Sequence, residues 1–172
     1  MMVTLLTGGA RSGKSSLAQQ WAESQPGKLL YVATATVGDE EMAARVLRHR
    51  QQRNERWQTL EEPLWMVERL AEASAGMDGV VVDCLTLWLS SLYFHFDEQP
   101  EPVMRQVDRL IDCLPEVSAP LWMVSNELGN GIVPENRMAR AFRDLNGEVN
   151  QRLAAVADKV FLVTAGLPLQ LK

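Results

Sequence analysis

The sequence is short of cysteine, basic charge and long apolar runs, and each shortage argues against a class of protein. Its two cysteines, Cys84 and Cys113, stand in apolar surroundings and lack metal-ligand spacing, which predicts buried free thiols in a reducing cytoplasm. No apolar run approaches the roughly 20 residues that span a bilayer, and the N-terminal stretch MMVTLLTGG lacks the basic region of a signal peptide. With a net charge of −5 and no basic tail, general nucleic-acid binding is not expected.

The composition is that of a folded, soluble protein. Hydrophobic residues make up 47% of the chain and charged residues 23%, which rules against disorder. A length of 172 residues suits one compact domain and is too short for two, so residues 1–172 are predicted to form a single domain.

Short apolar runs alternate with longer stretches of helical period. The runs predict strands at residues 3–7, 29–33, 80–83, 121–125 and 160–164, and the longer stretches predict helices at 14–24, 40–57, 85–93, 102–114 and 134–157. Strands that are apolar on both faces belong in a mostly parallel sheet with helices on both faces, which is a doubly wound α/β fold. Because ligands of such sheets bind at the carboxyl ends of the strands, the residues that follow each strand are the candidates for function.

The strongest motif follows the first predicted strand. Gly8, Gly9, Ala10, Arg11, Ser12, Gly13, Lys14 and Ser15 fit G-x-x-x-x-G-K-[ST] at every fixed position, with a strand before and a helix after. In this motif, backbone N–H groups surround phosphate oxygens, the lysine reaches the β and γ phosphates, and the hydroxyl of Ser15 ligates Mg²⁺. The alternative is a glycine-rich turn that only resembles the motif. We therefore predict a nucleoside triphosphate site on a RecA-like P-loop NTPase fold.

Asp83 ends the apolar run VVVD and has the position of a carboxylate that holds Mg²⁺ beside a P-loop. An aspartate here could instead cap the helix that follows it. The guanine-reading motif N-K-x-D is absent, which argues against a Ras-like switch GTPase.

The stretch RVLRHRQQRNER, residues 45–56, concentrates five arginines around one of only two histidines. In a helix, His49 would share a face with Arg45 and Arg53, and like charges at this spacing repel unless an anion lies between them. Nearby cations favour the neutral imidazole, which is a nucleophile toward phosphorus. The alternative is a solvated arginine-rich face. The other histidine, His95, stands among aromatic residues and is predicted to be structural.

Nearly end to end, the chain resembles the bifunctional adenosylcobinamide kinase/adenosylcobinamide-phosphate guanylyltransferases of cobalamin biosynthesis. The matching segments are TGGARSGKS (7–15), YVATA (31–35), DEEMAARVLRHRQQR (39–53), VVDCLTLWLS (81–90), SNELGNGIVPENRMARAFRDLNGEVNQRLAA (125–155) and LVTAGLP (162–168). The resemblance implies two reactions, in which GTP or ATP first phosphorylates adenosylcobinamide. GMP from GTP is then transferred to that phosphate through a covalent GMP–histidine intermediate, releasing pyrophosphate.

The resemblance also implies roles for particular residues. The histidine that carries GMP corresponds to His49, and the phosphate-binding lysine to Lys14. Some relatives have a second histidine in place of Arg48, and some have glutamate in place of Asp83. The nucleotide contacts carry over onto residues 8–15 and onto Ala33, Thr34, Ala35, Arg50, Gln51, Gln52, Arg53, Glu61 and Asp83, with Ser15 and Asp83 as magnesium ligands.

Some alternatives stay open at this point. The chain could be a kinase alone, without a covalent intermediate, or a regulatory ATPase of RecA type that needs no corrinoid. Asn126 and Glu127 follow a predicted strand and could either contact substrate or form a structural turn. By resemblance, we expect a homo-oligomer, with a trimer as the expected state.

Overall fold

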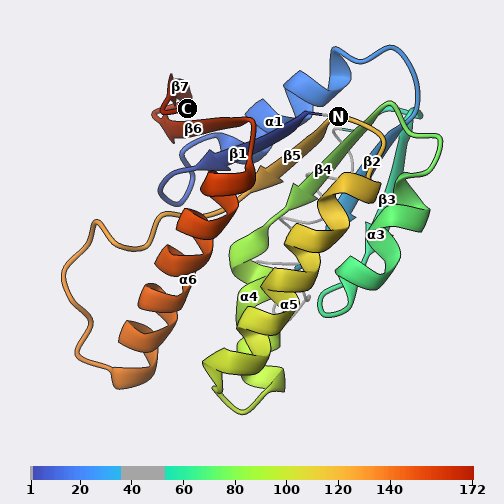
Figure 1. Cartoon of the computed structure of the whole chain (residues 1–172). Coiled ribbons are helices and arrows are strands. Elements are labelled where there is room, and N and C mark those ends of the chain that lie inside the picture. Colours follow the sequence, from blue (N-terminus) through green and yellow to red (C-terminus); the bar gives the residue numbers. More distant parts are fainter. Residues whose placement is uncertain (1, 36–52) are drawn as a thin grey trace.

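The computed structural model describes residues 2–35 and 53–172, and these residues form a seven-stranded sheet flanked by helices (Figure 1). Along the chain the strands are β1 (Val3–Thr7), β2 (Leu29–Ala33), β3 (Trp57–Glu61), β4 (Gly79–Asp83), β5 (Leu121–Val124), β6 (Lys159–Thr164) and β7 (Leu167–Gln170). The helices are α1 (Lys14–Glu23), α3 (Met66–Ser74), α4 (Leu85–His95), α5 (Pro100–Cys113), the short 3₁₀ helix η1 (Leu114–Glu116) and α6 (Arg137–Val156).

The strand order is β3-β2-β4-β5-β1-β6-β7, and all neighbours in the described sheet are parallel except β6 and β7. Every residue of β1 and of β5 is buried, as expected for strands covered by helices on both faces. In this order β5 lies between β1, which leads into the P-loop, and β4, which ends at Asp83. The two sequence motifs therefore meet at the carboxyl ends of the central strands.

Helices cover both faces of the sheet, as the sequence predicted. On one face, Ala18 and Ala22 of α1 pack with the inward side chains of the strands, including Leu6, Tyr31 and Val81. Helices α3, α4, α5 and α6 cover the opposite face in a larger core (Figure 1), to which they contribute Met66, Leu70, Trp88, Val107 and Leu145. The mostly parallel α/β architecture predicted from the sequence is confirmed.

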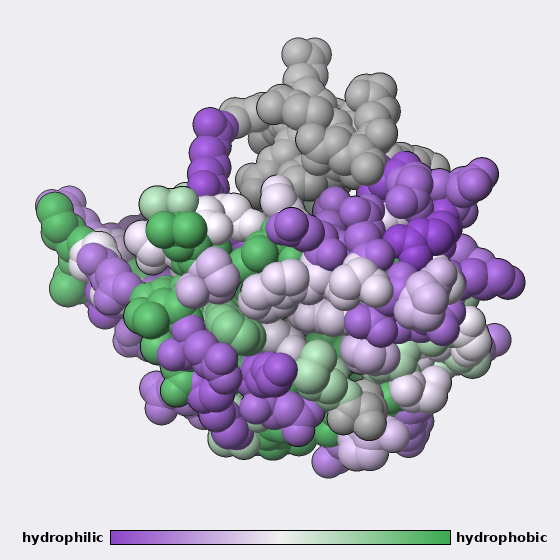
Figure 2. All heavy atoms as spheres, turned by 90° about the horizontal axis from the view of Figure 1, so that it is seen from above, coloured by the Kyte–Doolittle hydropathy of each residue, from purple (hydrophilic) through white to green (hydrophobic). Residues whose placement is uncertain are grey.

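The two edges of the sheet differ in polarity. Figure 2 shows hydrophobic atoms mainly in its left half, on the side where Figure 1 has β7 and the connection before α6. The side chains of Ile132, Leu167 and Leu169 are exposed there. At the other edge, β3 exposes Gln58, Thr59 and Glu61.

Some predicted elements need correction. The helix predicted at 40–57 is wrong at its end, because residues 53–56 form an irregular segment and a turn, and Trp57 begins β3. The rest of that prediction, residues 40–52, lies outside the described residues. Strands β3 and β7 and helix α3 were not predicted, while the five predicted strands are confirmed to within one residue at each end.

The prediction of buried thiols is confirmed, since Cys84 and Cys113 are both buried and neither forms a disulfide within the described residues. Among the described residues, no helix combines the length and the apolar character needed to cross a membrane.

Candidate nucleotide and metal site

The P-loop turns sharply between β1 and α1. Gly8 has a φ of 149°, and a Cβ at this position would overlap the carbonyl oxygen of Val163 in β6. Only glycine allows the loop to lie this close to the neighbouring strand. Helix α1 then begins at Lys14 with Gly13 as its N-cap, and no side chain caps it or places a carboxylate in its first turn. Its first N–H groups and its positive dipole end are thus suited to a phosphate.

Lys14 is buried, with 5% of its surface exposed, and its ammonium group points back into the loop. The Nζ atom donates to the carbonyl oxygen of Gly9 at 2.6 Å and lies 3.3 Å from Oγ of Ser12. A buried ammonium that is held by loop oxygens lies where it can meet phosphate oxygens with little reorganisation.

Three predicted contacts lie in register across neighbouring strands. Ala33 at the end of β2 pairs with Glu61 of β3 on one side and with Asp83 of β4 on the other. Thr34 is fully buried and ties this edge together, because its N–H donates to the carbonyl of Asp83 at 3.2 Å and its hydroxyl donates to the carbonyl of Cys84 at 2.7 Å. The structure therefore brings four predicted residues together at the carboxyl ends of the strands, namely Ala33, Thr34, Glu61 and Asp83.

Asp83 does not cap helix α4. The N-cap of α4 is Cys84, and no side chain donates or accepts a capping hydrogen bond there. Instead, Oδ2 of Asp83 accepts a hydrogen bond of 2.6 Å from the hydroxyl of Tyr31, a residue of β2 that sequence reasoning did not single out. The capping alternative is therefore wrong. The carboxylate of Asp83 lies at the carboxyl ends of the strands, where the P-loop also lies.

The oxygen donors present fit a magnesium ion that is held together with a nucleotide. Such an ion takes only one or two protein oxygens besides water and phosphate oxygens. Asp83 and Ser15 supply a carboxylate and a hydroxyl of this kind at the ends of β4 and of the P-loop. In the part of the chain that the structure describes, no group of three or more histidine, cysteine, aspartate or glutamate side chains forms an all-protein metal cage.

Comparisons with known proteins extend this geometry to a family. The family model described as cobinamide kinase / cobinamide phosphate guanyltransferase matches residues 4–171. The chain belongs to this family. It is 42% identical over 172 residues to the bifunctional adenosylcobalamin biosynthesis protein CobP of Pseudomonas aeruginosa, covering 99% of this chain and 98% of that protein. It is 38% identical over 182 residues to the bifunctional adenosylcobalamin biosynthesis protein CobU of Salmonella typhimurium, covering 99% and 100%.

Among solved structures, the chain is similar to the RadB recombinase, with a TM-score of 0.55. The match covers 94% of this chain and 73% of that one. At 16% identity this likeness shows the fold alone, and it confirms the RecA-like architecture predicted for this member of the cobinamide kinase / cobinamide phosphate guanyltransferase family.

The central histidine prediction lies outside the described residues. His49, Arg50, Gln51 and Gln52 belong to the segment 36–52, so their placement is not described. Arg53 is described, and its guanidinium carbon lies 4.0 Å from the centre of the Tyr31 ring, while its NH1 atom donates to Oγ1 of Thr59 at 3.2 Å. Arg53 of the arginine-rich stretch thus lies on the ring of Tyr31, whose hydroxyl is hydrogen-bonded to Asp83.

The hairpin of β6 and β7 supports the P-loop, although sequence reasoning assigned it no role. The N–H of Gly166, in the turn of the hairpin, donates to the carbonyl of Ser12 at 2.9 Å. A Cβ on Gly13 would lie 3.2 Å from Cα of Gly166, so the two backbones are close. The segment LVTAGLP was already among those resembling the family, and this contact gives a physical reason for its two-residue turn.

A buried polar network fixes the backbone after β5. The carbonyl of Asn126 accepts from the side-chain amides of Asn146 at 2.8 Å and Asn150 at 3.1 Å, and its N–H donates to Oγ1 of Thr86 at 2.8 Å. The N–H of Glu127 donates to the carbonyl of Gly8 at 2.9 Å. Asn126 and Glu127 therefore form part of a structural turn that also lies against the P-loop.

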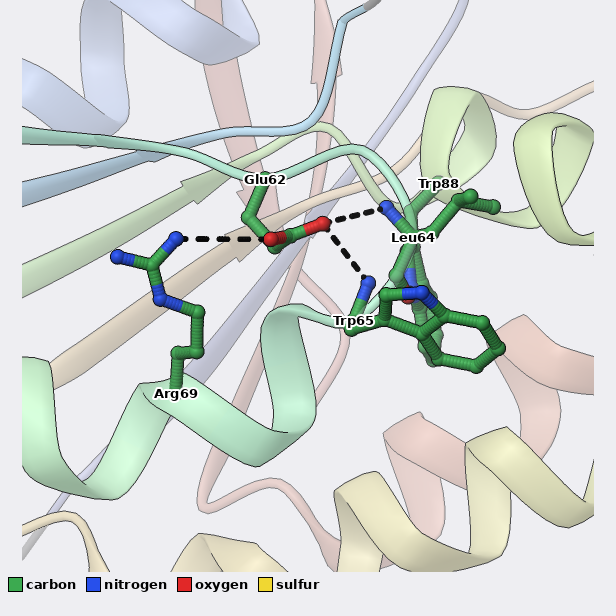
Figure 3. A network of polar contacts seen from close by, with 5 residues as sticks. All are labelled: Glu62, Leu64, Trp65, Arg69 and Trp88. Carbon is green, nitrogen blue, oxygen red and sulfur yellow. Dashed lines mark hydrogen bonds and ion pairs between the residues drawn. The ribbon is translucent and has the colours of Figure 1, made fainter.

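The connection after β3 is held by Glu62 (Figure 3). Its Oε1 atom accepts from the N–H groups of Leu64 at 3.2 Å and Trp65 at 3.0 Å, and its Oε2 atom lies 3.5 Å from NH1 of Arg69. Burial alone would raise the pKa of Glu62, but the two N–H groups and the guanidinium outweigh it and lower the pKa below its ordinary value. This turn directly follows Glu61 and so fixes the end of β3.

Proposed function

We propose that this chain catalyses both reactions of its family, the phosphorylation of adenosylcobinamide and the transfer of GMP to the resulting phosphate. The observation that carries the proposal is the family match over residues 4–171, joined to a P-loop in which Lys14 is buried and held by loop oxygens. The donor of the first step is GTP or ATP, and the donor of the second is GTP.

In the kinase step, the aminopropanol hydroxyl oxygen of adenosylcobinamide forms a bond to the γ-phosphorus of the nucleotide. The bond from that phosphorus to the oxygen that bridges the β and γ phosphates breaks, a nucleoside diphosphate leaves, and the proton of the hydroxyl is released. Phosphoryl transfer needs mainly positioning and charge stabilisation, which Lys14 and the N–H groups at the start of α1 supply.

In the transfer step, a ring nitrogen of His49 forms a bond to the α-phosphorus of GTP, and pyrophosphate leaves. An oxygen of adenosylcobinamide phosphate then attacks the same phosphorus, the P–N bond breaks, and adenosylcobinamide-GDP is formed. Arginines around the histidine would stabilise the negative charge that develops on the phosphates.

Two sets of side chains complete the proposed site. Ser15 and Asp83 would hold Mg²⁺, which neutralises charge on the phosphate oxygens when it is bound. The proposed nucleotide contacts are residues 8–15 together with Ala33, Thr34, Ala35, Arg50, Gln51, Gln52, Arg53, Glu61 and Asp83.

Incubation with GTP labelled at the α-phosphorus tests the proposal directly. We expect label on the protein that is labile in acid and stable in alkali, and that is absent from His49→Ala. His95→Ala is the matched control, because His95 is the only other histidine in the sequence and contacts Trp65 and Phe96 rather than the site. A His49→Ala variant that still acquires label would contradict the role of this histidine. A wild-type protein without label would contradict the transfer step and mean that the chain is only a kinase.

Several broader properties belong to the same proposal. We infer that residues 1–172 act as one catalytic domain in the cytoplasm, which the buried free thiols of Cys84 and Cys113 support. We expect a homo-oligomer, with a trimer as the expected state, and no nucleic-acid partner. Light scattering on the protein as it elutes from a size-exclusion column measures the mass of the oligomer.

A further inference from the structure

Tyr31 occupies an unusual place for a residue of the sheet interior. It lies in β2 with only 5% of its surface exposed, and it pairs in register with Val81 of β4. Asp83 follows two residues later on β4, so its side chain is on the same face of the sheet as the Tyr31 ring. The phenol therefore crosses from one strand to the carboxylate of the next.

The hydrogen bond between them is short and charge-assisted. The hydroxyl of Tyr31 lies 2.6 Å from Oδ2 of Asp83, within the range of O–H donors to a carboxylate. A phenol carries its proton at neutral pH, so the hydroxyl is the donor and the carboxylate oxygen the acceptor of this hydrogen bond.

The ring is held by other groups as well. The guanidinium of Arg53 lies over one face at 4.0 Å, and the indole of Trp57 packs edge-on with a centroid distance of 6.0 Å. A phenol fixed in this way gives the carboxylate of Asp83 one preferred orientation. A carboxylate whose Oδ2 is held by a hydroxyl is restricted in which lone pairs it can offer to a cation.

We propose that Tyr31 is a positioning residue that orients the Asp83 carboxylate for the metal–nucleotide complex used in both steps. This inference rests on the proposed function of Asp83 as a magnesium ligand. It adds a group that acts through the carboxylate of Asp83 and sets how this carboxylate is presented to the metal. Groups that orient metal ligands through hydrogen bonds change metal affinity by about 10- to 100-fold when they are removed.

A simple packing role is the competing explanation, and Tyr31→Phe separates the two. This substitution keeps the ring, its burial and its contact with Arg53, and removes only the hydroxyl. A residue that serves packing alone would leave metal affinity unchanged. Tyr93→Phe is the matched control, because Tyr93 is the only other tyrosine in the sequence, is also buried, and lies in α4 against Phe142.

The decisive measurement is Mn²⁺ binding in the presence of GTP, followed by the electron paramagnetic resonance signal of free Mn²⁺. It is made in a His49→Ala background, so that GMP transfer does not consume the nucleotide. We expect the Mn²⁺ dissociation constant to rise about 10-fold in Tyr31→Phe and to stay unchanged in Tyr93→Phe. GTP binding measured in excess chelator should be the same for all three proteins.

Two results would overturn the inference: a Mn²⁺ affinity of Tyr31→Phe within about twofold of its background, or an equal loss in Tyr93→Phe. In the enzyme with His49 intact, the Mg²⁺ concentration for half-maximal rate should rise by the same factor in both reactions. The Mn²⁺ titration needs only nucleotide and protein, so it can be interpreted even if wild-type protein shows neither corrinoid phosphorylation nor GMP labelling. That second result would contradict the proposed function instead.

Discussion

At the scale of single residues, Lys14 stands out because a lysine side chain is buried at the start of a helix. Two of its partners are a backbone carbonyl and a hydroxyl of its own loop, at 2.6 and 3.3 Å, and neither of these two carries a negative charge. An ammonium group prefers anionic acceptors, with which its hydrogen bonds are about twice as strong as with neutral ones. A phosphate is the acceptor that this arrangement suits.

We therefore expect Lys14→Ala to lower both the kinase and the GMP-transfer rates by about 100- to 1000-fold, the range found when one preorganised charge-stabilising donor is removed. Steady-state rates with labelled nucleotide measure both steps. Lys28→Ala is the control, because Lys28 is exposed and precedes β2, at the amino ends of the parallel strands. If either step kept a rate near that of wild type, a single phosphate site for both reactions would be wrong.

Glu62 makes a residue-scale prediction about pH. Its pKa is lowered in the folded state, so the stability it contributes is present above its unfolded pKa of about 4.3 and is lost as the pH falls through the folded value. Glu62→Gln should lower the free energy of unfolding by about 1 kcal/mol at neutral pH, and by less at about pH 3. Urea unfolding of variant and wild type at both pH values measures the difference in their free energies of unfolding. Glu148→Gln, at an exposed position of α6, is the control for the loss of one carboxylate.

At the scale of elements, the strands that could be predicted from the sequence are those that are buried. Strands β1, β2, β4 and β5 are almost wholly buried and read as continuous apolar runs, so their positions were predicted to within a residue. Strand β3 has only Leu60 buried, and β7 has no buried residue and contains Pro168. Edge strands of this kind have no apolar pattern to detect, and they tolerate proline because one side of the strand is unpaired.

The candidate site divides in the same way. The P-loop and Asp83 could be predicted because short sequence motifs, each next to an apolar run that forms a strand, identify them. Tyr31 was not, because its role depends on the pairing of β2 with β4, which joins residues 52 positions apart in the sequence. The contact between Gly166 and Ser12 was missed for the same reason.

The β6–β7 hairpin carries the element-scale prediction. Its two turn residues, Ala165 and Gly166, have positive φ values of 52° and 79°, as in the tight turns that match strand twist. Gly166→Ala should destabilise the protein by about 1–2 kcal/mol, because a Cβ disfavours this backbone conformation. It should also weaken GTP binding, since Gly166 supports the P-loop. Thermal unfolding and nucleotide titration measure the two effects.

Gly131→Ala is the control for this change. No heavy atom lies within 4 Å of the added Cβ at either position, but Gly131 lacks a positive φ. We expect its stability to change by less than about 0.5 kcal/mol. An equal loss in the two variants would mean that the hairpin conformation is not the cause.

At the scale of the whole molecule, the strand order turns distant segments into one site. The P-loop follows β1, Asp83 ends β4, and β5 between them is followed by the polar turn at Asn126. The sheet therefore connects the proposed nucleotide contacts at residues 8–15 and the proposed metal ligand Asp83 through hydrogen-bonded neighbouring strands. Since strands β1 to β6 all contribute buried residues to the two core layers on the faces of this sheet, occupation of the site should stabilise the described fold as a unit.

This argument gives a prediction for thermal unfolding. A ligand that binds only the folded state at 100 times its dissociation constant adds about 2.7 kcal/mol of stability, which for a chain of this size raises Tm by about 5–10 °C. We expect one cooperative transition that shifts by this amount with Mg²⁺ and GTP, in a His49→Ala background that prevents turnover. The shift should be much smaller when Lys14→Ala is added, at equal nucleotide concentration, because the phosphates lose their buried cation. Two separate transitions, one of them insensitive to nucleotide, would show that residues 1–172 do not unfold as a single domain.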